Sequence, residues 1–259
     1  LGKGVENLNV GDRVMAKLAH GGFAEQAVAE ASETWSLFDR MSFADGAAFA
    51  VAYLSAHVAL RWQGRLEAGE TLLVLGAAGG SGMAAVEIGK ALGARVIGAA
   101  SSEEKLQAIL QHGADHAVNY SSNNMKEQVL ELTGGEGADV CFDPVGGDIF
   151  DSALSSLGWG GRHIHFGFVG GVPRVPANRL LVKHRSAVGS SLRYFQSRRP
   201  DLLVQSMTEL AAAYGKGAFN PVISHRLPLE RGVDALRLLT DRKAVGKVVV
   251  EVVPENEIN

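Results

Sequence analysis

The sequence predicts an α/β fold built around a doubly wound parallel sheet of the Rossmann type, and three observations support this. From Glu70 onward, short runs rich in β-branched residues alternate with helical stretches, a pattern that predicts right-handed βαβ units. A glycine-rich turn at 76–82 joins the first of these runs to its helix. Residues 1–40 and the tail at 246–253 carry short alternating runs instead, which indicates a second, β-rich lobe made from both chain ends.

The expected elements follow in order along the chain. In the first lobe, the turn-bounded runs at 11–16 and 21–29 read as strands. The longest apolar run, 44–60, includes Asp45 and His57 and is short for a bilayer span, so we expect a buried helix. In the alternating region we expect strands at 70–78, 95–100, 116–120, 138–145 and 162–168, and helices at 81–92, 102–111, 125–132 and 150–157. Gly113 is expected to end the second of these helices in the left-handed conformation.

Composition narrows the class of protein. The 259 residues are 46% hydrophobic, which is enough for a large core, and a net charge of −3 without blocks of like charge argues against nucleic-acid or membrane partners. Cys141 is the only cysteine, so neither a disulfide framework nor a four-thiolate zinc site can form, and a cytoplasmic location is expected. Because the chain begins at Leu1 in what reads as the middle of a β-domain, we expect an N-terminal truncation.

The glycine-rich turn is the strongest functional signal. A strand that runs into glycines and then a helix is the arrangement that places a pyrophosphate on backbone N–H groups, here at Gly79, Gly80 and Gly82. Glycine clusters also occur in ordinary turns, but the following βα repeats favour a nucleotide. The residues do not match a Walker loop, since Ala91 follows Lys90 where Ser or Thr is required. No tyrosine has a lysine four residues on, so the catalytic pair of short-chain dehydrogenases is missing.

The end of the second strand indicates which dinucleotide binds. Ser101 and Ser102 offer hydroxyls and Lys105 offers a cation, a set that suits a ribose 2′-phosphate and therefore NADPH. An ordinary capping box running from Ser101 to Glu104 is compatible with this role. Glu103 and Glu104 leave NAD as an alternative, because an acidic residue can accept the ribose 2′-hydroxyl.

The segments "GDRV", "AAGGSG", "ARVIGAASSEEK", "VNY", "DPVGG" and "GKVVVEV" occur in an order that resembles the zinc-independent quinone oxidoreductases of the medium-chain dehydrogenase/reductase superfamily, in the quinone-oxidoreductase-like branch. The resemblance covers essentially the whole chain. It implies a GroES-like catalytic lobe at 1–50 and 194–259, without its N-terminal part, and a Rossmann NADPH-binding domain at 51–193. It also implies a homodimer, with the segment 169–180 contributing to the contact.

The resemblance also implies a set of cofactor contacts at matching positions. They are Ser55 near the nicotinamide amide; Gly79, Gly80, Ser81 and Gly82 at the pyrophosphate; Ser101, Lys105 and Tyr120 around the 2′-phosphate; Val145 and Gly146 on the adenine and ribose side; Gly167 and Phe168 on the nicotinamide side; and Leu192 and Arg242 as later contacts.

The expected chemistry needs no metal. Zinc members of the superfamily polarise their substrates with Cys and His ligands, which one cysteine cannot reproduce. A hydride acceptor must then be electrophilic already, as quinones and α,β-unsaturated carbonyls are. Tyr53 is the candidate catalytic residue, and the alternative interpretation is a buried aromatic side chain in a packed helix. His163 and His165 share one face of a strand but show no third ligand at a readable spacing, so no metal site is expected. An NADPH-binding protein with little or no turnover and an enoyl-thioester reductase are the alternatives.

Overall fold

The structure is a computed structural model that describes residues 1–121 and 124–253. The chain divides into two compact units, one formed by residues 1–52 with the C-terminal part from residue 220, and the other by residues 53–219. Each unit is described by itself.

The larger unit is built on a parallel six-stranded sheet, which confirms the predicted fold class. Its strand order is β5-β4-β3-β6-β7-β8, so the chain moves outward from β3 on one side, returns to the centre and moves outward on the other. This is the doubly wound order of a dinucleotide-binding domain. The strands are β3 (Thr71–Val74), β4 (Arg95–Ala100), β5 (His116–Asn119), β6 (Ala138–Asp143), β7 (Leu157–His165) and β8 (Ser186–Gly189).

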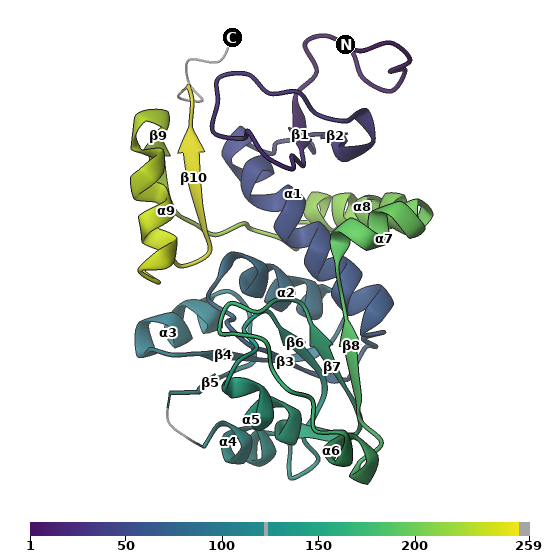
Figure 1. Cartoon of the computed structure of the whole chain (residues 1–259), viewed down its shortest axis with the longest axis vertical. Coiled ribbons are helices and arrows are strands. Elements are labelled where there is room, and N and C mark those ends of the chain that lie inside the picture. Colours follow the sequence, from purple (N-terminus) through teal and green to yellow (C-terminus); the bar gives the residue numbers. More distant parts are fainter. Residues whose placement is uncertain (122–123, 254–259) are drawn as a thin grey trace. The chain divides into compact units, whose positions relative to one another are not determined.

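Helices cover both faces of this sheet. Figure 1 shows α2 and α3 on one face and α4 and α5 on the other. Helix α3 ends where the sequence predicts, since Gly113 has a φ of 95°. The helices of this unit are α2 (Gly80–Ala91), α3 (Glu103–Gln111), α4 (Met125–Leu132), α5 (Ile149–Ser156), α6 (Ala177–Val182), α7 (Leu192–Arg198) and α8 (Pro200–Gly215).

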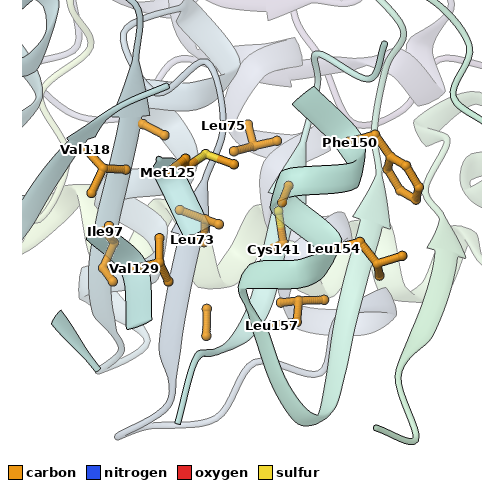
Figure 2. Packing of buried hydrophobic residues seen from close by; sticks show 13 residues of the cluster. Leu73, Leu75, Ile97, Val118, Met125, Val129, Cys141, Phe150, Leu154 and Leu157 are labelled. Atoms are coloured by element: carbon orange, nitrogen blue, oxygen red, sulfur yellow. The ribbon is translucent and has the colours of Figure 1, made fainter. Parts of the chain in front are cut away.

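The main hydrophobic core lies between the sheet and the pair α4 and α5. Alternate strand residues, including Leu73, Ile97 and Cys141, point toward Val129 and Leu154 on these helices (Figure 2). Cys141 is completely buried, and burial raises the pKa of its thiol well above its ordinary value. It is the inert core residue that the sequence predicts.

The opposite face of the sheet is packed with small residues. A Cβ atom at Gly89 of α2 would lie 2.6 Å from Leu72 Cδ2, and one at Gly98 of β4 would lie 2.3 Å from Ile109 Cγ2. These separations are shorter than van der Waals contact, so the helices can lie this close only because glycine occupies both positions.

The smaller unit contains two separate pairs of strands. Strands β1 (Val14–Ala16) and β2 (Thr34–Ser36) pair antiparallel, and β9 (Ile223–Pro228) and β10 (Lys247–Glu251) pair parallel. The unit also contains the short helices η1 (Ala31–Glu33) and η3 (Leu229–Arg231) and the helix α9 (Gly232–Thr240). The strand predicted at 21–29 is wrong: this segment is irregular and mostly exposed, so its alternating pattern does not correspond to a buried face.

The apolar run at 44–60 forms α1 (Phe43–His57), which continues into the π-helical segment η2 (Val58–Gln63). Together they have the length and composition of a membrane span, but 78% of the most apolar window is buried inside the protein. That burial agrees with the predicted core helix.

The larger unit extends further toward the C-terminus than residue 193. Helices α7 and α8 belong to it. Side chains of α8 contact the segment at 57–62: Trp62 Nε1 donates a hydrogen bond to Ser206 Oγ at 2.9 Å, and His57 Nε2 lies 3.2 Å from Glu209 Oε2. Because these contacts join residues far apart in the chain, no local sequence pattern predicts them.

Candidate nucleotide site

The candidate site lies at the carboxyl edge of the six-stranded sheet. Because all six strands are parallel, the segments that follow them meet at one edge, and a doubly wound sheet binds ligands where the strand order reverses. The predicted cofactor residues of the larger unit follow β3, β4, β5, β6 and β7, or lie on the neighbouring helices.

The glycine turn between β3 and α2 has a tightly defined backbone. Gly76 has a φ of 55°, and its carbonyl accepts a hydrogen bond from Gly79 N at 2.9 Å. A Cβ atom at Gly82 would lie only 2.3 Å from Gly76 O, whereas one at Gly79 would be 3.4 Å from the same atom. Gly82 is therefore required by packing within the turn, while Gly79 is exposed and leaves space above the turn.

The start of α2 fits an anion. Its N-cap residue is Gly79, which has no side chain to bind the first backbone N–H groups of the helix. These N–H groups carry the positive end of the helix dipole. Gly80 and Ser81, the first residues of the helix, are partly exposed.

A second loop, following β6, is held by the buried carboxylate of Asp143. Its Oδ1 atom accepts hydrogen bonds from the backbone N–H groups of Val145 and Gly146, both at 2.8 Å, and Oδ2 lies 2.9 Å from His163 Nε2. Burial alone would raise the pKa of Asp143, but these hydrogen bonds outweigh it and hold the pKa below its ordinary value. The loop carrying Val145 and Gly146 is thus fixed by an ionised side chain.

Two double-glycine loops interlock at this edge. Gly147 N donates to Gly171 O at 2.8 Å and Gly170 N donates to Val145 O at 2.7 Å. A Cβ atom at Gly147 would lie 2.2 Å from Gly170 O, so side chains at this crossing are excluded. The loop after β6 also reaches the first turn, because a Cβ atom at Gly76 would lie 3.1 Å from Val145 Cγ2.

The predicted 2′-phosphate residues follow β4 and β5, which are neighbouring strands. Ser101 is exposed, Lys105 and Tyr120 are half-buried, and Tyr120 N donates to Ala100 O at 3.1 Å. The predicted capping box is wrong: the N-cap of α3 is Ser102, and its side chain makes no capping hydrogen bond. The hydroxyls of this segment are therefore not used to begin the helix.

Four predicted cofactor-contact residues meet in one cavity of about 950 Å³. They are Ser55, Gly167, Phe168 and Leu192. Aromatic and basic side chains for which the sequence predicted no cofactor contact also line it, among them Trp62, Phe166, Tyr194, Phe195, Arg198 and Arg199. Trp62 lies seven residues after Ser55 on the same continuous helical segment, and this i, i+7 spacing could have indicated it, whereas nothing local indicates the residues of α7.

Tyr53 is placed differently. It is buried, its hydroxyl donates a hydrogen bond to the carboxylate of Glu87 on α2, and its ring packs against Phe219 with a centroid distance of 5.4 Å. It does not line the cavity that contains Ser55. This environment supports the reading of Tyr53 as a packed aromatic.

Arg242, the remaining predicted contact, belongs to the smaller unit. It follows α9 and has a φ of 57°, an uncommon conformation for a residue with a side chain. Its predicted role stays a prediction.

Comparison with known proteins gives the family. Residues 80–209 match the family model of zinc-binding dehydrogenases. A quinone oxidoreductase-like protein 2 homolog from Nematostella vectensis is 37% identical over 96% of this chain and 69% of its own length. The chain belongs to the quinone oxidoreductase family of the medium-chain dehydrogenase/reductase superfamily. A Bos taurus quinone oxidoreductase-like protein 2 is also 37% identical, over 96% of this chain and 72% of its own length.

Solved structures agree with the fold. Escherichia coli quinone oxidoreductase complexed with NADPH superposes with a TM-score of 0.89 at 28% identity, covering 98% of this chain and 78% of its own. A mycobacterial protein complexed with NADPH has a TM-score of 0.90 at 33% identity, covering 96% of this chain and 78% of its own. The CurK enoyl reductase has a TM-score of 0.87 at 27% identity, covering 97% and 75%.

Proposed function

We propose that this family member is an NADPH-dependent reductase that acts on a quinone or an α,β-unsaturated carbonyl compound. The observation that carries the proposal is the uncapped glycine turn at 76–82, which shares one sheet edge with the loop that holds Val145 and with the cavity that contains Ser55. A dinucleotide needs these three places in this relation: one for the pyrophosphate, one for the ribose and one for the nicotinamide.

The residues present fit the cofactor. Exposed Gly79 has no Cβ to block a pyrophosphate from the backbone N–H groups, and Ser101, Lys105 and Tyr120 offer two hydroxyls and a cation for the 2′-phosphate. We assign the contacts to Ser55, Gly79, Gly80, Ser81, Gly82, Ser101, Lys105, Tyr120, Val145, Gly146, Gly167, Phe168, Leu192 and Arg242. When bound, NADPH would supply a hydride.

The acceptor is expected to be a planar, electrophilic molecule. The aromatic side chains of the cavity wall can pack on a flat ring and keep water away from it. The only cysteine is buried in the sheet, so we propose that hydride transfer proceeds without a cysteine-bound zinc and that the acceptor itself stabilises the developing negative charge. Ser55 would orient the nicotinamide end rather than take part in proton transfer.

We further propose a cytoplasmic homodimer in which the segment 169–180 contributes to the contact. Val169 and Val172 in this segment are about four-fifths exposed, at 82% and 78%, as expected for apolar residues covered by a second copy. Sedimentation of the purified chain would give the expected dimer mass, and Val172→Glu would shift it to the monomer.

An enoyl-thioester reductase is the second candidate, and the similarity to the CurK enoyl reductase favours it. The cofactor half would be the same, and only the acceptor would differ. An NADPH-binding protein without turnover is the remaining alternative.

One experiment separates these functions. Fluorescence titration of the chain with NADPH and NADH measures cofactor binding, and loss of NADPH absorbance with 1,4-benzoquinone or crotonyl-CoA then measures turnover. We expect preferential NADPH binding and turnover with the quinone. Turnover with crotonyl-CoA alone would support the enoyl reductase, binding without turnover would support a non-enzymatic role, and absence of binding would contradict all of these functions.

A further inference from the structure

Three potential metal ligands meet where β6 and β7 end. In the parallel pairing of these strands, Cys141 lies opposite His163 and Asp143 lies opposite His165. Residues opposite one another, and residues two apart on one strand, point to the same face of a sheet. One ligand atom from each of Asp143, His163 and His165 therefore lies within 4.8 Å of the other two.

The histidines of this group have unused nitrogen atoms. His163 Nδ1, His165 Nδ1 and His165 Nε2 are buried from solvent and have no hydrogen-bond partner among residues 1–121 and 124–253. A buried polar atom without a partner costs about 1–3 kcal/mol, so such atoms are rare unless something binds them. The two nitrogen atoms of His165, next to a carboxylate and a second imidazole, indicate a site for a cation.

The surroundings hold two of the ligands in place. Asp143 and His163 are fully buried, and Asp143 Oδ1 is already fixed by the two backbone N–H groups of the following loop. The ring of Phe150 on α5 packs on both histidines, with centroid distances of 4.8 Å to His163 and 5.2 Å to His165. The buried carboxylate favours a bound positive charge, and the apolar cover strengthens this attraction by excluding water.

We propose that Asp143, His163 and His165 form a binding site for a divalent transition metal of the Zn²⁺ class. Two imidazoles and one carboxylate are a ligand set for Zn²⁺, Co²⁺ or Ni²⁺, whereas Mg²⁺ and Ca²⁺ prefer oxygen alone. This proposal replaces the expectation that the histidine pair lacks a third ligand. The missing ligand comes from the neighbouring strand.

Binding requires a small movement. Ligand atoms on one tetrahedral ion lie about 3.4 Å apart, given bonds of about 2.0–2.1 Å. Asp143 Oδ2 and His163 Nε2, which are 2.9 Å apart, must therefore separate slightly, and His165 must turn its nitrogen toward the same ion. His165 can supply this movement, since it is only partly buried and has no hydrogen bond to break. The hydrogen bond between His163 Nε2 and Asp143 Oδ2 would give way to bonds with the ion, with release of the proton.

The bound ion would stabilise the folded state. It would join the ends of β6 and β7 next to the two interlocked glycine loops, and three protein ligands leave one coordination position for a water molecule. The proposal does not depend on NADPH binding, so it is tested on the chain without nucleotide.

The test is binding of Co²⁺ to the chain after treatment with a chelator. We expect one Co²⁺ per chain with visible absorption bands of a four- or five-coordinate site, displaced by Zn²⁺, and a higher melting temperature with either ion. His165→Gln, which keeps a similar volume, should weaken binding at least about 10-fold and remove these bands. His20→Gln, at an exposed histidine of the other unit, should change neither.

Asp143→Asn provides a second variant, since it keeps the shape of the side chain and its contact with the backbone N–H groups. It should also weaken Co²⁺ binding, and circular dichroism in the presence of chelator would establish that each variant is folded. Failure of the folded wild-type chain to bind Co²⁺ would overturn the proposal. So would binding that His165→Gln leaves unchanged.

Discussion

The two ends of the candidate nucleotide site are built in different ways. At the glycine turn, the backbone is determined by contacts between main-chain atoms, and a single Cβ at Gly82 would approach Gly76 O to 2.3 Å. At the 2′-phosphate end, the predicted contacts are the side chains of Ser101, Lys105 and Tyr120, which are exposed or half-buried. If the proposed function is correct, this difference means that dinucleotide binding depends on packing within the turn, while the choice between NADPH and NADH depends on replaceable surface side chains.

The largest effect is expected from Gly82→Val. The added side chain would overlap Gly76 O and the backbone of Ala77, so the turn or the helix must shift. We expect a loss of about 3 kcal/mol in the free energy of unfolding, measured by urea denaturation. A fully stable variant would show that the turn is looser than the packing indicates.

Gly79→Val is the matched change within the same turn. A Cβ here lies 3.4 Å from Gly76 O, an ordinary contact, and the φ of −82° suits any residue. Stability should therefore change little, while affinity for NADPH and NADH should both fall about 30-fold, or about 2 kcal/mol, since the side chain blocks approach to the backbone N–H groups. Unchanged affinity in the fluorescence titration would remove the turn from the site.

Lys105→Ala addresses the other end of the site. Loss of a charge-assisted hydrogen bond to the 2′-phosphate should weaken NADPH about 10-fold and leave NADH nearly unchanged. Glu104→Ala, at an exposed position of the same helix, serves as the control because removal of its negative charge should not weaken NADPH. An equal loss for NADPH and NADH in Lys105→Ala would contradict the proposed 2′-phosphate contact.

The smallest effect concerns the helix that carries Ser55. Burial lowers the pKa of His57, two residues further on, and Arg61 lowers it too, although Glu209 of α8 opposes them. Since the folded-state pKa lies below the unfolded value of 6.5, the unfolded chain binds more protons between the two values. The stability contribution of neutral His57 is complete above the unfolded pKa and declines as the pH falls toward the folded pKa.

Replacement of His57 should therefore reduce the pH dependence of stability. Between about pH 6.5 and about pH 5.5, His57→Gln should lose less of its unfolding free energy than the wild type, by at most about 1.4 kcal/mol. Urea denaturation at both pH values measures this difference. His20→Gln, at an exposed position, should retain the wild-type slope, and an identical slope in His57→Gln would mean that His57 does not titrate in this range.

Local patterns determined much of the fold. The strand at 95–100 and the helix at 125–132 occur at the predicted residues, because the periodicity of apolar side chains records which face each element buries. The left-handed conformation of Gly113 and the burial of Cys141 were also predicted from the sequence. The segment at 21–29 was not, since short alternating runs occur in exposed irregular chain as well as in strands.

The sequence by itself determined the parallel sheet, the glycine turn and the family, because hydrophobic period, glycine spacing and motif order are properties of neighbouring residues. Only the tertiary structure decided which distant side chains meet. It placed the Tyr53 hydroxyl on Glu87, Trp62 on Ser206 and Asp143 beside the histidines of β7. The physical reason is that strand register and helix packing set these contacts, and both arise from the summed packing of the whole unit rather than from any short stretch of chain.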